Sequence, residues 1–133
     1  MTKKLVEVKK LNKKFKNNNT VIKVLKNIDL SLESGKLIAL VGPSGSGKST
    51  FLHLLALLDR PTKGEIVLLG NKTGSISDAK RNLIIRNNIS IIFQNHNLLT
   101  DFTALENVAI PLIIRGNDYE SSIKKASKIL SSV

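Results

Sequence analysis

Apolar and polar residues alternate in two segments near the start of this chain. Residues 5–11 and 21–33 contain period-two patterns rich in β-branched side chains, which are typical of strands, and an Asn-rich turn separates them. We therefore expect an antiparallel pair of strands as the first unit of structure.

Two segments predict strands of a different kind: the continuous apolar run Leu37–Val41, and Ile89–Phe93, which is apolar except for Ser90. Short apolar runs bounded by turn residues are typical of parallel strands that are buried on both faces. A further short strand is expected over Glu65–Leu69, because Gly70 and Asn71 follow it as turn residues. The order of these segments predicts an α/β fold.

The remaining periodic segments predict helices. Thr103 and Glu106 have the spacing of a capping box, and Pro111 is expected to kink or end the helix that they begin. We expect helices over residues 48–58, from Ser77 or Asp78 to about Arg86, over Thr103–Ile114 and from about Tyr119 to Leu130.

A glycine-rich loop directly after the run at 37–41 carries the most specific chemistry. It matches the phosphate-binding pattern G-x-x-x-x-G-K-[ST] in spacing and in its position between a strand and a helix. In that setting, backbone N–H groups form a concavity for a polyphosphate at the positive end of the helix dipole. The candidate nucleotide-binding residues are Gly42, Pro43, Ser44, Gly45, Ser46, Gly47, Lys48, Ser49 and Thr50.

Two of these residues have distinct chemical tasks. Lys48 is expected to reach the β- and γ-phosphates of a nucleotide, and the Ser49 hydroxyl is expected to bind Mg2+. The alternative is a chance match in an ordinary loop, which the preceding apolar strand argues against.

Composition and charge limit the other possibilities. The chain has 133 residues, no cysteine and a formal charge of +11, and no apolar run approaches the roughly 18 residues of a membrane helix. The charge invites a nucleic-acid interpretation, but many lysines fall within residues 3–16 and only four Phe and one Tyr offer stacking surfaces. We favour a solvated basic surface over a membrane-surface role, and expect no nucleic-acid partner.

Three further features accompany the loop: Phe15 before the second strand, the Phe93-Gln94 pair after an apolar run, and the segment Leu-Leu-Thr-Asp-Phe-Thr-Ala-Leu-Glu-Asn-Val at 98–108. With them the chain resembles the ATP-binding subunits of ABC transporters, and the last segment is similar to the lipoprotein-releasing branch and the related macrolide-exporter branch. The resemblance implies a P-loop ATPase fold of the ABC type, with an ABC ATPase core over residues 1–95 and the start of a helical subdomain over 96–133.

The resemblance also implies roles, cofactors and partners. Phe15 would stack on adenine, although it could instead anchor the first hairpin; Gln94 would contact Mg2+ or the attacking water, although it could be a solvated loop residue. Lys48 and Gln94 would be the catalytic residues, Ser49 and Gln94 the metal ligands, and Mg-ATP the cofactor. The implied partners are membrane-spanning transporter subunits and a second ATPase subunit, at the cytoplasmic face of the inner membrane.

Several motifs of that family do not occur in these 133 residues. The Leu-Ser-Gly-Gly-Gln signature is missing, no apolar run is followed by Asp-Glu, and His53 and His96 do not stand where the family's switch histidine would. Without the paired carboxylates the site would lack a positioned water for phosphoryl transfer. We therefore expect the N-terminal part of an ATPase, and keep open a truncated, binding-only protein and, less favoured, another P-loop enzyme such as a small kinase.

Overall fold

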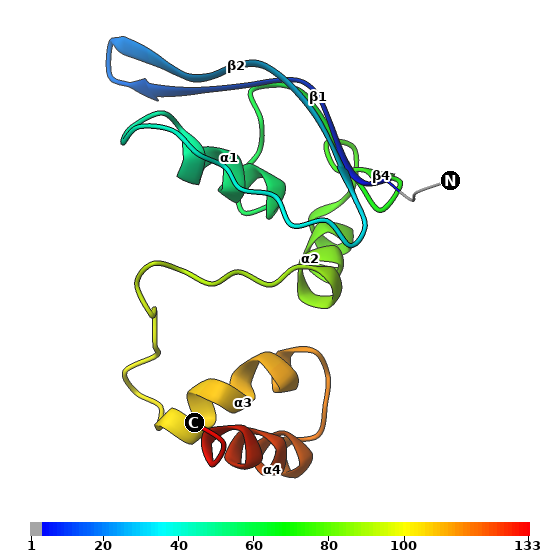
Figure 1. The fold of residues 1–133 in the computed structure, drawn as a ribbon, viewed down its shortest axis with the longest axis vertical. Coiled ribbons are helices and arrows are strands. Elements are labelled where there is room, and N and C mark those ends of the chain that lie inside the picture. The colour runs from blue at the N-terminus through cyan, green and yellow to red at the C-terminus, as the bar shows by residue number, and fades with distance from the viewer. Residues whose placement is uncertain (1–3) are drawn as a thin grey trace. The chain divides into compact units, whose positions relative to one another are not determined.

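The first two strands form a long antiparallel hairpin in the computed structural model, which describes residues 4–133. The chain divides into two units, residues 1–85 and 86–133, and each is described separately. All strands of the described chain belong to the first unit, where Figure 1 labels β1, β2 and β4. They form one sheet in the order β2-β1-β3-β4. They are β1 (Lys4–Asn17), β2 (Thr20–Glu33), β3 (Lys63–Leu68) and β4 (Asn71–Lys72).

The core of the first unit lies between one face of this sheet and helix α1 (Lys48–Leu55). Apolar side chains from both elements are buried, as expected if alternate strand residues face one layer of helix. They include Val6, Val8, Leu11, Leu25, Phe51, Leu54, Ile66 and Leu68. The strands predicted over 21–33 and 65–69 are confirmed to within two residues at each end. The strand predicted over 5–11 is also confirmed, but it continues six residues further, to Asn17.

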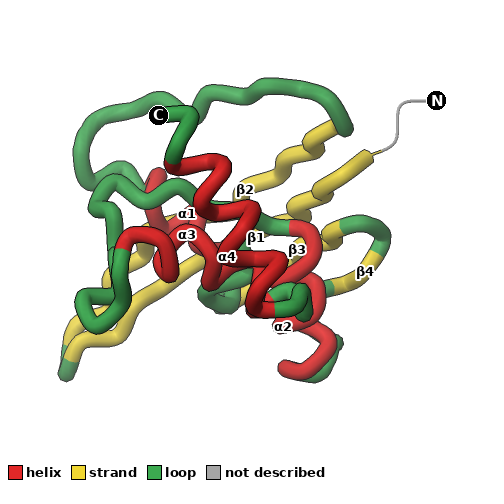
Figure 2. The backbone as a smooth tube through the Cα atoms, turned by 90° about the horizontal axis from the view of Figure 1, so that it is seen from below, coloured by secondary structure: helices red, strands yellow, loops and turns green. Residues whose placement is uncertain are grey.

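The strands predicted at Leu37–Val41 and Ile89–Phe93 do not form in this structure. Both segments are irregular, as the loops in Figure 2 show, and the side chains of Leu37 and Ile92 are fully exposed. A parallel strand requires hydrogen-bonded neighbours. Every ladder in the described residues is antiparallel, and none includes these two segments. The two segments therefore have no neighbouring strand with which to form backbone hydrogen bonds.

The helices of the first part of the chain depart from expectation only at their ends. Helix α1 ends at Leu55 rather than at residue 58, because Ala56 caps it and Leu57 takes a positive φ of 58°. Helix α2 covers Asp78–Asn88, two residues beyond its predicted end. Such differences at helix ends are ordinary.

The second unit contains two packed helices, α3 (Ala104–Ile114) and α4 (Tyr119–Leu130). Small side chains are fully buried on both helices, at Ala109, Ser122 and Ala126, which allows the two backbones to approach closely. Pro111 lies inside α3 and does not end it. The helix lacks one N–H donor at this residue, yet it continues to Ile114. The division into an ABC ATPase core over residues 1–95 and the start of a helical subdomain over 96–133 stays a prediction.

Among the described residues, no helix is both long and apolar enough to cross a membrane.

Candidate nucleotide-binding site

The helix after the glycine-rich loop begins at a residue that provides no side-chain cap. Gly47 is the N-cap of α1, with φ 92° and ψ 8°, and no side-chain hydrogen bond caps the first turn. The first N–H groups of a helix have no partner within the helix, so an uncapped start leaves donors for a ligand, at the positive end of the helix dipole. The local geometry thus suits an anion.

Packing of the hairpin against the loop explains why glycine stands at position 47. A Cβ atom there would lie 2.9 Å from Cδ2 of Leu25 and 3.0 Å from Cγ1 of Val24. The β1–β2 register shifts between Lys13 and Lys14, beside Val24, and such an irregularity re-aims side chains. Strand β2 therefore holds the loop closely at this point.

The ammonium of Lys48 folds over the loop from the first turn of α1. Its Nζ donates to the carbonyl oxygens of Gly42 at 2.8 Å and Pro43 at 2.7 Å, and to Oγ of Ser46 at 3.5 Å. These contacts fix a positive charge at the centre of the loop.

The other residues of the loop surround a hollow of about 580 Å³. It is lined by Val24, Ser44, Gly45, Gly47, Lys48, Ser49 and Thr50. The lining residues include three with hydroxyl side chains, two glycines and one lysine, and none with a carboxylate. All nine predicted loop residues are thus brought together, either on this wall or at the Lys48 ammonium, in a site that favours a phosphate over a cation.

Magnesium fits this donor set only with a phosphate partner. Among residues 4–133, no three His, Cys, Asp or Glu side chains gather where they could hold a metal ion. In phosphate sites, however, Mg2+ takes only one or two protein ligands and is otherwise bound by phosphate oxygens and water. The Ser49 hydroxyl on the wall of the hollow meets that requirement.

Phe15 lies on the same hairpin as the residues that contact the loop. It pairs with Ile22 across the ladder, two residues from Val24 on the wall of the hollow, and it is 42% exposed. It does not line the hollow described above. Its exposure is more than a core anchor would have, but its predicted stacking on adenine stays a prediction.

Gln94 belongs to the second unit, in an irregular and exposed segment. Its predicted roles at Mg2+ and at the attacking water stay predictions. His53 lies on α1, as its helical context suggested.

An ion pair between β1 and the turn after α1 involves a lysine that was not among the predicted site residues. Lys13 is almost buried, and its Nζ lies 2.6 Å from Oδ2 of Asp59, in the turn that follows α1. Lys13 is two residues from Leu11 and two from Phe15 on β1, so it lies on the same face of the strand as they do. This alternation is the one sequence signal that could have indicated the burial of Lys13. No local pattern could identify Asp59 as its partner, since the two residues are far apart along the chain.

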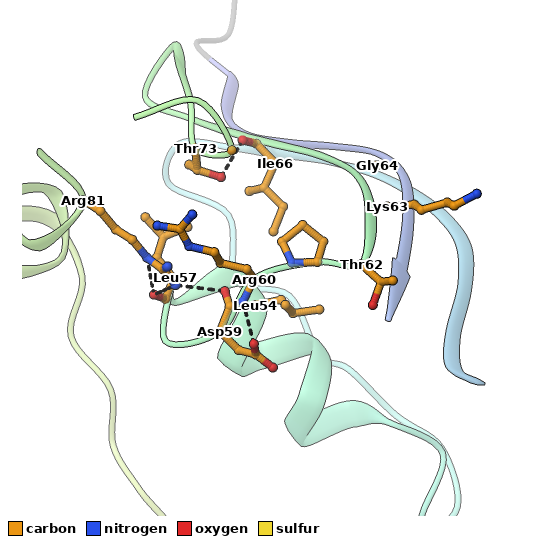
Figure 3. Close-up of a pocket in the computed structure, with 12 residues that line it drawn as sticks. Leu54, Leu57, Asp59, Arg60, Thr62, Lys63, Gly64, Ile66, Thr73 and Arg81 are labelled. Carbon is orange, nitrogen blue, oxygen red and sulfur yellow. Dashed lines mark hydrogen bonds between the residues drawn. The ribbon is translucent and has the colours of Figure 1, made fainter. Parts of the chain in front are cut away.

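Asp59 is held in place by several donors. Figure 3 shows the turn that contains it, beside a cavity of about 250 Å³. Partial burial acts to raise the pKa of Asp59, but the hydrogen bonds from Lys13 and from the Arg60 N–H, with the charges of Lys13 and Arg81, lower it overall. The Arg81 guanidinium donates to the carbonyl oxygens of Leu57 and Asp59, which ties this turn to α2.

The uncapped helix start, the glycine contact and the folded lysine suit a phosphate, and comparison with known proteins identifies the family of the chain. The ABC transporter family model matches residues 25–133. The chain is 46% identical over 126 residues to the lipoprotein-releasing system ATP-binding protein LolD of Rickettsia typhi, covering 95% of this chain and 55% of that protein. The LolD protein of Rickettsia bellii is 42% identical over 134 residues, covering 100% of this chain and 58% of the relative.

Solved structures that resemble this chain belong to the same family. An ATP-binding cassette described as a dimer in a post-hydrolysis state, bound to ADP and Pi, has a TM-score of 0.87 and 38% identity, over 96% of this chain and 56% of that one. A second structure, described as a dimeric bacterial ABC transporter cassette, has a TM-score of 0.88 at 37% identity with the same coverage. The chain belongs to the ABC transporter family, and the predicted ABC ATPase fold class is confirmed. It spans little more than half the length of the curated relatives it matches.

Proposed function

We propose that this chain binds Mg-ATP through residues 42–50, as part of the ATP-binding subunit of a transporter that releases lipoproteins from the inner membrane. The observation that carries the nucleotide part is the Lys48 ammonium, held over the loop by the carbonyl oxygens of Gly42 and Pro43 beside an uncapped helix start. The proposed cargo is supported by the names of the relatives, which are ATP-binding proteins of lipoprotein-releasing systems.

The residues of the site then have separate tasks. The first-turn amides of α1 and the Lys48 ammonium bind and orient the phosphates, and the Ser49 hydroxyl is placed to complete the shell of Mg2+. Bound ATP would supply the phosphoryl group and its leaving group. Phe15 is proposed to stack on the base, and Gln94 to act at Mg2+ or the attacking water.

Partners are proposed on a separate observation. The segment 98–108 places Leu98, Leu99 and Phe102 on the surface with about half of their area exposed. Exposed apolar side chains in one short segment are typical of a protein contact. We propose that this segment meets a membrane-spanning subunit at the cytoplasmic face of the membrane, and that two ATP-binding subunits work as a pair.

A second candidate function is nucleotide binding without turnover. It is favoured by one observation, the absence of an Asp-Glu pair after any apolar run of the sequence. A water that is not positioned by a carboxylate attacks phosphorus slowly.

The nucleotide part is tested by titrating the chain with a fluorescent ATP analogue and Mg2+. Replacement of Lys48 by Ala should weaken binding at least tenfold, because the phosphates lose a charge-assisted partner worth about 1.5–3 kcal/mol. Lys36→Ala, at an exposed lysine outside the loop, is the matched control and should bind like the parent chain. Equal affinity of the Lys48 variant and the parent would refute the proposed site.

A further inference from the structure

Lys13 is unusual among the lysines of the first hairpin because its charge is almost buried. Its side chain is 11% exposed, whereas that of Lys9 on the same strand is 60% exposed. An ammonium group is costly to remove from water unless it is paired and hydrogen-bonded. Lys13 is therefore not simply one of the solvent-exposed charges of the hairpin surface.

Two oxygen atoms of the turn after α1 fix the Lys13 ammonium. Its Nζ lies 2.6 Å from Oδ2 of Asp59 and donates to the carbonyl oxygen of Arg60 at 2.8 Å. The lysine itself comes from β1, opposite Leu25 in the ladder. The group therefore joins the hairpin to the end of the helix that begins at the phosphate loop.

The same ammonium lies against the ring of Phe15. The distance from Nζ to the ring centroid is 4.9 Å, within the range of a cation–π contact. Lys13 and Phe15 are two residues apart on one strand, so their side chains leave the same face of the sheet. The ring is nonetheless 42% exposed, so part of its surface stays open to a ligand.

We propose that Lys13 is a positioning residue for the adenine base: anchored by Asp59, it holds the Phe15 ring in the orientation in which its exposed part stacks on the base. This inference rests on the proposed ATP binding, and it adds a specificity determinant outside the phosphate loop. The ammonium stabilises one arrangement of the ring before the nucleotide arrives, which reduces the ordering that binding must otherwise impose.

Direct attraction of the phosphates by Lys13 is a different role, and the geometry argues against it. The Asp59 carboxylate at 2.6 Å compensates the charge of Lys13, and Lys13 is absent from the wall of the hollow at the loop. The two roles predict opposite effects of removing Asp59. A positioning lysine loses its anchor and ATP binding weakens, whereas a phosphate-binding lysine gains free charge and binding strengthens.

The test measures the affinity of the chain for Mg-ATP and for inorganic tripolyphosphate by calorimetry. Lys13→Met and Asp59→Asn should each weaken ATP binding roughly 3- to 10-fold, as expected for the loss of a cation–π contact, and leave tripolyphosphate binding unchanged. Lys13→Arg keeps a cation beside the ring and should bind ATP more tightly than Lys13→Met does. Lys16→Met, at an exposed lysine of the same strand, is the control and should change neither affinity.

A double variant separates this inference from the proposed function. If Lys13 acts through Phe15, adding Lys13→Met to Phe15→Ala should cause no further loss of ATP affinity. If Phe15→Ala weakens ATP binding but Lys13→Met does not, only the role of Lys13 is wrong. If Phe15→Ala has no effect, the proposed base contact itself is wrong.

Two other outcomes would overturn the inference. Tighter binding of both ligands by Asp59→Asn would make Lys13 a phosphate ligand. Loss of both ligands in Lys13→Met and Asp59→Asn alike would show that the pair serves only the fold, and thermal unfolding of the same samples would register that loss.

Discussion

A Cβ atom placed on Gly47 would lie 2.9 Å from Cδ2 of Leu25, so strand β2 sets how closely the phosphate loop can be held. Gly47→Ala should therefore destabilise the chain by about 2–4 kcal/mol, from the sum of a positive φ and an overpacked contact. Thermal or urea unfolding measures this. Gly35→Ala is the matched control, because Gly35 has a φ of 76° and nothing within 4 Å of its would-be Cβ. If Gly47→Ala lowers the free energy of unfolding no more than Gly35→Ala does, the contact with Leu25 is not what requires glycine at position 47.

Removal of the Phe15 ring should weaken adenine nucleotide binding. Base–aromatic stacking is worth roughly 1–3 kcal/mol, so Phe15→Ala should raise the Kd for ATP by about 5- to 100-fold. The Kd for inorganic tripolyphosphate, which has no base, should not change. Phe102→Ala removes a similarly exposed ring from the second unit and should leave both constants unaltered. An unchanged Kd for ATP in the Phe15 variant would favour the alternative of a hairpin anchor.

Local signals accounted for the elements whose determinants lie close together in the sequence. The Thr103 and Glu106 side chains form the predicted capping box at the start of α3, and α4 has its predicted bounds, with Asp118 as the N-cap. The hairpin was predicted from alternation alone. In each case the hydrogen bonds that define the element join residues a few positions apart, or strands connected by a short turn.

Features that depend on distant residues were not predictable in the same way. The apolar runs at 37–41 and 89–93 have the composition of buried parallel strands, but a strand forms only beside a partner, and the described sheet pairs neither. The contact of Lys13 with Asp59 joins the hairpin to the end of α1, and nothing local to either residue indicates it. The loop chemistry at 42–50, by contrast, follows from spacing, because the start of α1 orients its own amides.

Hydrolysis should be absent from these 133 residues on their own. No apolar run of the sequence leads into an Asp-Glu pair. The chain should bind ATP yet release no phosphate above the background of buffer with Mg2+, because a general base or a water-positioning carboxylate is required. A phosphate-release assay with the Lys48→Ala variant as the baseline measures this. A Mg2+-dependent rate that exceeds this baseline would contradict the prediction.

The capping box of α3 should make the stability of the second unit depend on acid pH. The Thr103 hydroxyl and then the Thr103 N–H donate to the Glu106 carboxylate, at 2.7 and 2.8 Å, and lower its pKa below the ordinary 4.5. A carboxylate with a lowered folded pKa stabilises the fold above its unfolded pKa, and this stabilisation is lost as the pH falls from that value through the folded pKa. Urea unfolding followed by helical circular dichroism should therefore show a loss of stability in this window. Glu106→Gln should reduce that loss, and Thr103→Ala should cost about 0.5–2 kcal/mol at neutral pH. Glu120→Gln, in the first turn of α4, is the comparison variant, and an acid-induced loss as large in Glu106→Gln as in Glu120→Gln would show that the capping box is not its source.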